Sequence, residues 1–156
     1  MGRVFFSIFV LLFSFFMSFS QIQTINTVGT TFSPDTVILN LGDTVEFGSL
    51  GYHNAVEVDE STWIANDTTY NGGFYFGLGS PGGYFIPDSA KTYYYVCQPH
   101  ASMSMKGVIV VNSPPSLTYV PDANFEQALI NLGYDIGTPN GSVPTVNIDT
   151  VTFLDV

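Results

Sequence analysis

The 156-residue chain has few of the side chains that usually carry metal, redox or electrostatic chemistry: one Cys, two His, one Trp and three Lys+Arg. One Cys excludes an internal disulfide framework. Three basic residues against 13 acidic ones exclude the basic surface that binds nucleic acid or an anionic membrane. Hydrophobic residues make up 46% of the chain and aromatic residues 15%, which excludes a disordered protein. We therefore expect a folded protein.

Residues 1–20 predict a secretory signal peptide. Arg3 gives a short basic start, residues 4–17 are mostly apolar, and the Ser-Phe-Ser tripeptide 18–20 places small residues before a cleavage site at Gln21. The apolar run is shorter than the roughly 20 residues of a membrane anchor. We therefore expect cleavage, no stable membrane span afterwards, and an exported protein that is periplasmic, secreted or on the cell surface.

Residues 21–112 predict a single all-β domain. Short β-branched and aromatic runs alternate with turn-forming clusters such as Ser33-Pro34-Asp35 and Asn71-Gly72-Gly73, and no amphipathic helix is evident. This pattern is typical of an antiparallel sandwich or barrel. The expected strands are 36–41, 43–47, 55–58, 74–76, 92–97 and 107–112.

The soft metal donors of the exported chain are concentrated at two places. His53 lies at the start of one expected strand, and the segment from Cys97 through His100 to Met105 joins two others. One thiolate, two imidazoles and a thioether form the donor set of a trigonal copper site with a weak axial Met. Zinc could use the same three N and S donors, but the thioether favours copper. We expect the 97–105 loop to supply three donors, and His53 to tie the site to the opposite sheet.

The pattern Cys97-x-Pro-His100-x4-Met105-x-Gly, with His53-Asn54 and the segment 42–47 upstream, resembles the blue copper (cupredoxin) family, nearest to plastocyanin and pseudoazurin. The resemblance covers residues 24–112. It implies a cupredoxin-like Greek-key β-sandwich holding one type 1 copper ion, with His53, Cys97 and His100 as equatorial ligands and Met105 as the axial ligand. It also implies that the Asn54 side chain steadies the ligand loop by hydrogen bonding.

The axial position has a second candidate, because Met103 would give a shorter ligand loop, as in amicyanin. We prefer Met105, which is followed by x-Gly and by the apolar run 108–111. Met103 would then be a surface residue or would fill a packing gap.

The resemblance implies a one-electron carrier that cycles between Cu(II) and Cu(I), and not an enzyme. The exposed edge of His100 would be the electron port, surrounded by an apolar docking patch of Pro99, Ala101 and Met103. The acidic balance favours a redox partner with a basic docking face, such as a c-type cytochrome or a reductase. Two alternatives stay open: a module that sequesters or delivers copper, and a surface interaction protein with an accessory cupredoxin domain.

The composition changes at residues 113–117, a Pro- and Ser-rich linker. Residues 118–156 then predict a short helix, with Asp122 as its N-cap and Gly133 as its stop, followed by a strand. Residues 118–133 and 151–156 resemble the lead-in and the first strand of secreted leucine-rich-repeat proteins. The alternative is a plain helix and strand that pack on the sandwich.

Overall fold

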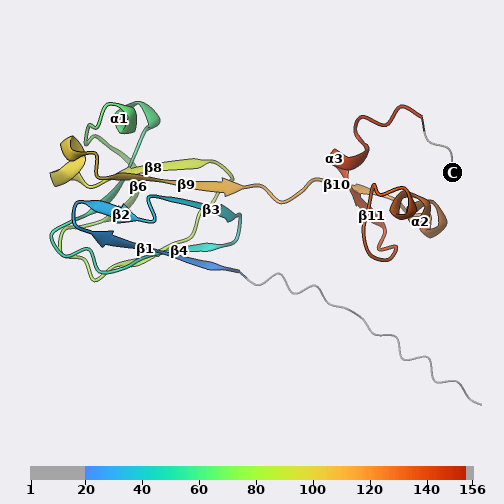
Figure 1. Ribbon diagram of the computed structural model, residues 1–156, viewed down its shortest axis with the longest axis horizontal. Coiled ribbons are helices and arrows are strands. Elements are labelled where there is room, and N and C mark those ends of the chain that lie inside the picture. Colours follow the sequence, from blue (N-terminus) through green and yellow to red (C-terminus); the bar gives the residue numbers. More distant parts are fainter. Residues whose placement is uncertain (1–19, 154–156) are drawn as a thin grey trace, which may run out of the picture.

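The computed structural model describes residues 20–153, so the expected signal peptide, apart from Ser20, and the last three residues lie outside the described part. Two sheets face each other in the larger lobe (Figure 1). The four-stranded sheet has the order β2-β1-β4-β7. Its strands are β1 (Ile22–Val28), β2 (Thr31–Ser33), β4 (Thr44–Phe47) and β7 (Gly83–Phe85). β1 and β4 are parallel, and the other pairs are antiparallel.

The five-stranded sheet carries the metal-donor loops and has the order β3-β9-β8-β5-β6. Its strands are β3 (Thr36–Asn40), β5 (Ala55–Val58), β6 (Tyr70–Phe76), β8 (Thr92–Val96) and β9 (Lys106–Asn112). The predicted β-sandwich is confirmed, and each of the six expected strands is present within a few residues of its predicted bounds. The strands of the sandwich that the sequence did not predict are β1, β2 and β7. β1 was missed because its one fully buried side chain, Ile25, stands among polar residues.

The core fills the space between the two sheets. Alternate residues of β3 and β9 are buried, as expected for strands with one face turned inward. Aromatic rings occupy the centre: Phe47 meets Tyr95 edge to face at a centroid distance of 5.4 Å, and Phe74 packs against both. Tyr93, Tyr95 and Cys97 share this core, so the metal-donor thiol is built on the same inward face as the aromatic rings.

A second cluster covers the outer face of the five-stranded sheet. The short helix α1 (Glu60–Ile64) places Trp63 against Tyr94 of β8, with ring centroids 5.4 Å apart. The Lys106 ammonium lies 4.0 Å from the Trp63 ring centroid and donates to the Trp63 carbonyl at 2.8 Å. No helix was expected here, because five residues are too few to show a helical period.

The C-terminal lobe follows a connection without regular structure at residues 113–116 (Figure 1). β10 (Leu117–Tyr119) pairs antiparallel with β11 (Ser142–Pro144), and α2 (Ala123–Asn131) lies between them in the sequence. The expected cap is confirmed, since the Asp122 side chain accepts from the backbone N–H groups of Asn124 and Phe125. The buried Glu126 carboxylate accepts from two further backbone N–H groups, those of Asn140 and Gly141.

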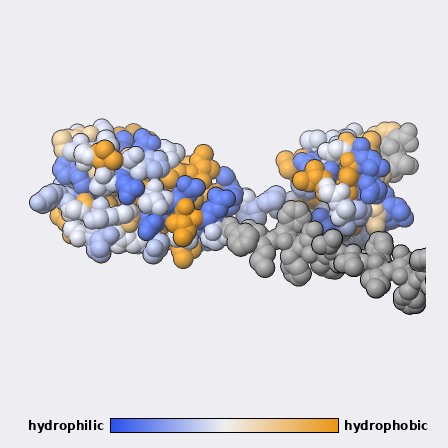
Figure 2. Space-filling model, turned by 60° about the horizontal axis from the view of Figure 1, so that its bottom comes forward, coloured by the Kyte–Doolittle hydropathy of each residue, from blue (hydrophilic) through white to orange (hydrophobic). Residues whose placement is uncertain are grey.

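The last described residues differ from the expected strand. α3 (Thr145–Ile148) is helical, and residues 151–153, the described part of the segment 151–156 that resembles a repeat strand, have no regular structure. The small core of this lobe consists of Val120, Leu129 and Val143. Both lobes show hydrophobic residues on the face seen in Figure 2. Within residues 20–153, no helix combines the length and the apolar content that a membrane crossing requires.

Candidate metal centre

The connection between β8 and β9 presents three of the metal donors, Cys97, His100 and Met105. Cys97 follows the last residue of β8 and caps the 3-10 helix η1 (Gln98–Met103), which Pro99 helps to start. Ser104 has a left-handed backbone (φ 62°) that ends this helix and turns the chain toward β9. The two ends of the loop are then joined, because the Cys97 N–H donates to the Met105 carbonyl at 2.9 Å.

The second imidazole comes from the turn before β5. Its backbone is fixed there, since the His53 N–H donates to the Leu50 carbonyl at 2.9 Å. The expectation that His53 ties the site to the opposite sheet is wrong: β5 lies directly beside β8 in the same five-stranded sheet. Antiparallel pairing explains why His53 lies near Cys97 and His100, because the start of β5 and the end of β8 lie at the same end of the sheet.

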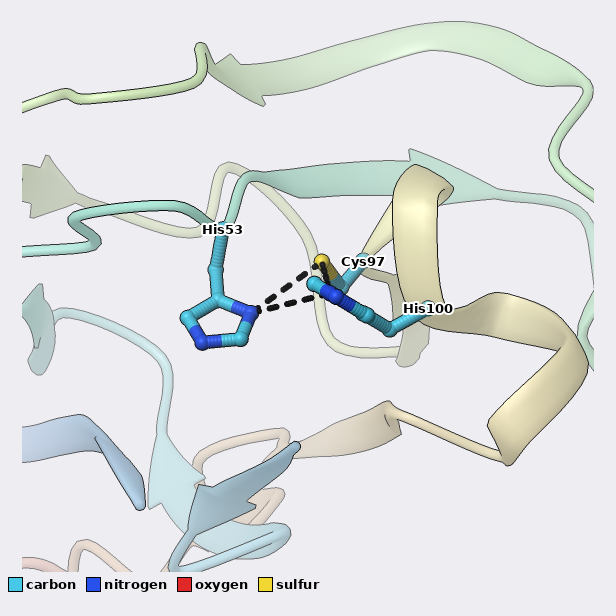
Figure 3. Close-up of side chains that lie close together, drawn as sticks. All are labelled: His53, Cys97 and His100. Carbon is cyan, nitrogen blue, oxygen red and sulfur yellow. Dashed lines mark hydrogen bonds between the residues drawn. The ribbon is translucent and has the colours of Figure 1, made fainter. Parts of the chain in front are cut away.

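The three side chains converge on one point (Figure 3). The Nδ1 atoms of His53 and His100 are 3.1 Å apart, and Cys97 Sγ lies 3.3 Å from His100 Nδ1 and 3.7 Å from His53 Nδ1. These atoms form the one group of three or more His, Cys, Asp or Glu donors within metal-binding reach among residues 20–153. Two imidazoles and a thiolate at this separation fit a copper ion bound between them.

The structure separates the two methionines. Met105 is fully buried and belongs to the same core cluster as Cys97, whereas the Met103 side chain is 54% exposed. A thioether that completes the donor set must share the interior with the thiol. This burial supports the preference for Met105 as the axial ligand, while Met103 lies at the protein surface.

The glycine of the Met105-x-Gly motif has a steric reason. A Cβ atom on Gly107 would overlap the Tyr95 hydroxyl. Tyr95 lies two residues before Cys97 and is fully buried, so any side chain at position 107 would have to push aside a buried ring of the strand that leads to the thiol. The motif therefore keeps β8 and β9 close together beside the ligands.

Hydrogen bonds from outside the donor set hold the ligand loop. The buried Asn54 side chain accepts from the Gln98 N–H at 2.7 Å and donates to the Gln98 side-chain oxygen at 2.9 Å. Gln98 then donates to the Thr68 carbonyl at 3.1 Å. The part played by Gln98 was not predicted, because a Gln between two ligands gives no signal in a single sequence.

The protein environment sets the charge state of the donors. Burial raises the pKa of the Cys97 thiol, while hydrogen bonds from the backbone N–H groups of Asn54 and His100 act in the opposite direction. Burial lowers the pKa of His53, and the neighbouring His100 lowers it further. The site therefore disfavours added positive charge on His53, which keeps that imidazole neutral and able to bind a metal ion.

One part of the expected docking patch needs correction. Pro99 is exposed and His100 is partly exposed, but Ala101 is only 1% exposed. Ala101 is buried against Val58 and Val96 in the cluster on the outer face of the five-stranded sheet. It therefore has no surface to offer a partner.

The family model "Copper binding proteins, plastocyanin/azurin family" matches residues 21–112. Among solved structures, the chain is similar to pseudoazurin from Methylobacterium extorquens AM1 at 21% identity, covering 58% of this chain and 75% of that one, with a TM-score of 0.45. It is similar to pseudoazurin from Hyphomicrobium denitrificans at 24% identity, covering 60% and 77%, with a TM-score of 0.44. It is also similar to a mutant fern plastocyanin at 22% identity, covering 58% and 100%, with a TM-score of 0.43.

No curated protein matches the chain. The family model, however, spans well over half of it and includes every residue of the converging donor set. With the buried Met105 beside Cys97, residues 53, 97, 100 and 105 form a complete His-Cys-His-Met type 1 copper ligand set on a two-sheet sandwich. The chain belongs to the plastocyanin/azurin family of copper-binding proteins.

Proposed function

We propose that the protein is an exported one-electron carrier with one type 1 copper ion. The observation that carries this proposal is the convergence of His53 Nδ1, His100 Nδ1 and Cys97 Sγ beside the buried Met105. When bound, copper supplies a Cu(II)/Cu(I) couple. The protein supplies soft and borderline donors that both oxidation states accept.

A rigid frame supports the carrier role. Cys97 and Met105 are joined by a backbone hydrogen bond of 2.9 Å, and the Met105 N–H donates to the His100 carbonyl at 3.2 Å. Asn54 ties the same loop to the turn that presents His53. Donors held in this way move little when the charge at the site changes by one unit, and a small rearrangement favours fast electron transfer.

The partly exposed His100 is the proposed electron port, and Pro99 and Met103 form the exposed part of the docking patch. We propose a redox protein with a basic face as the partner, such as a c-type cytochrome or a reductase. Lys91 and Lys106 are the basic residues after position 20, against 13 acidic residues. Both ammonium groups already have partners: that of Lys91 lies 3.9 Å from the Glu57 carboxylate, and that of Lys106 lies over the Trp63 ring. The remaining acidic charge would steer a basic partner in a salt-dependent way.

The domain assignment is part of the proposal. Residues 1–20 are the signal peptide, residues 21–112 the copper domain and residues 113–117 the linker. Residues 118–156 contain a helix and the start of a leucine-rich-repeat region. The Pro- and Ser-rich composition of the linker and the separate small core of the second lobe support this division.

Copper titration tests the proposed function. Adding Cu(II) to the protein without residues 1–20 should produce an intense visible thiolate-to-copper band, and the band should disappear and return over repeated reduction and oxidation. Fast electron exchange with a c-type cytochrome would support the carrier role. No colour would overturn the copper proposal, and a coloured site that exchanges electrons only slowly would favour copper sequestration or delivery.

Replacing Asn54 tests the proposed frame. Asn54→Ala removes both hydrogen bonds to Gln98, so we expect copper affinity to fall by about 10- to 100-fold. Competition with a chelator of known affinity measures this change. Asn147→Ala is the matched control, because Asn147 makes one side-chain bond to the Tyr134 carbonyl in the other lobe. Equal copper affinity in both variants would contradict a role for Asn54 at the site.

A further inference from the structure

The ligand loop carries a second thioether that the copper site does not use. Met103 ends the 3-10 helix that also contains His100, three residues earlier. In a 3-10 helix, side chains three residues apart lie one above the other on the same face. The exposed Met103 side chain therefore shares the helix face of His100, the partly exposed ligand of the loop.

An ion arriving from solvent meets this face before it meets the sulfur ligands. Cys97 and Met105 are both fully buried, so neither offers a first contact. The Nδ1 atom of His100 points inward to Cys97 Sγ at 3.3 Å (Figure 3), which leaves the opposite ring nitrogen, Nε2, on the other edge of the imidazole. We call Met103 and this outer edge of His100 the rim of the site; His53, on the turn before β5, is also partly exposed.

The chemistry of the rim favours one oxidation state of copper. Thioethers are soft donors that select Cu(I), whereas imidazole accepts both oxidation states. Met103 belongs to none of the hydrophobic clusters formed by the described residues, so packing does not account for it. An exposed thioether next to a ligand imidazole is suited to take Cu(I) from solvent or from a donor.

We propose that Met103 is a capture ligand for Cu(I): its thioether binds the ion at the rim and passes it to the four inner donors. The inference rests on the proposed copper-bound state and adds the route by which the reduced ion enters. The transfer is ligand exchange without oxidation or reduction. The bond from Met103 sulfur to copper breaks as the inner donors bind, and Cys97 releases its thiol proton to water.

The test measures how fast the metal-free protein takes up each form of copper. Cu(I) is supplied without oxygen as its bicinchoninate complex, whose colour disappears as copper moves to the protein. We expect Met103→Leu, which keeps the size and apolar character of the side chain, to take up Cu(I) about tenfold more slowly. That factor corresponds to a barrier higher by about 1.4 kcal/mol. Uptake of Cu(II), followed by growth of the visible band, should keep its wild-type rate.

Ser102→Ala is the matched control, since Ser102 is an exposed neighbour in the same helix that has no soft donor and lies off the face of His100. It should leave both rates unchanged. Wild-type Cu(I) uptake in Met103→Leu would overturn the proposal, and so would equal slowing of Cu(I) and Cu(II), which would show that Met103 acts by shaping the loop. Uptake by the wild-type protein is measured first. If the wild-type protein takes up neither Cu(I) nor Cu(II), the proposed copper function itself is overturned, together with the role of Met103.

Discussion

Replacing Cys97 by Ser is expected to abolish the intense visible band of the copper-loaded protein. The band requires a sulfur-to-copper bond, and Cys97 is the one cysteine of the chain. A serine hydroxyl stays protonated at neutral pH and is a hard, weak donor, so it cannot replace the thiolate. His53 and His100 remain, and we expect the variant to bind Cu(II) more weakly and without intense colour.

The fold of this variant should survive. Ser is close to Cys in size, and the backbone N–H groups of Asn54 and His100 that face the sulfur can donate to the new oxygen. Circular dichroism of the metal-free form checks this point, and an absorption spectrum after Cu(II) addition gives the result. An intense band that persists in Cys97→Ser would show that the colour arises away from this site and would contradict the ligand assignment.

The site was more predictable from the sequence than the sheet that carries it. Metal donors are rare in this chain, so the spacing of Cys97, His100 and Met105 in one loop restricted the geometry before any fold was known. The strand after His53, β5, was predicted to lie in the sheet opposite the ligand loop, but it lies in the same sheet as β8 and β9. Strand order depends on long-range pairing such as that of β5 with β8, and the local pattern of either strand carries no information about it.

Elements with weak local patterns were missed for a related reason. β1 pairs in parallel with β4 and its burial alternates, but two of its less exposed positions hold the polar residues Gln23 and Thr27, so its sequence lacks the apolar alternation that marks a half-buried strand. α1 forms where Trp63 can pack on Tyr94, a contact that depends on the outer face of a finished sheet. By contrast, the helix after Asp122 was correctly predicted, because its cap and its period are local properties.

The burial of Ala101 shows the same limit inside the site. Its position in the loop, next to His100, suggested a surface residue, but one turn of 3-10 helix is enough to direct neighbouring side chains to opposite sides. Ala101 contacts Val58 and Val96, and Met103 points to solvent. Sequence spacing therefore identified the ligands, while the structure was needed to separate the surface of the loop from its interior.

Replacing Met105 by Ala is expected to lower stability and to change the reduction potential, whereas Met103→Ala should change neither. Met105 is fully buried in the core, and truncation of such a methionine costs about 2 to 5 kcal/mol of unfolding free energy. Met103 is 54% exposed, and a surface truncation should stay within about 0.5 kcal/mol. Denaturant unfolding of the metal-free proteins measures the first effect, and redox titration of the copper-bound proteins measures the second.

A third variant separates packing from metal binding at this position. Met105→Leu keeps most of the buried volume, so its loss of stability should stay below about 1.5 kcal/mol. It still lacks the thioether, and the axial ligand tunes the potential of such sites, so its reduction potential should move as clearly as that of Met105→Ala. A wild-type reduction potential in Met105→Leu would show that Met105 contributes packing and is not a copper ligand. A shifted potential in Met103→Ala, with Met105→Ala unchanged, would assign the axial position to Met103 and would require the loop between His100 and β9 to turn Met103 inward when copper binds.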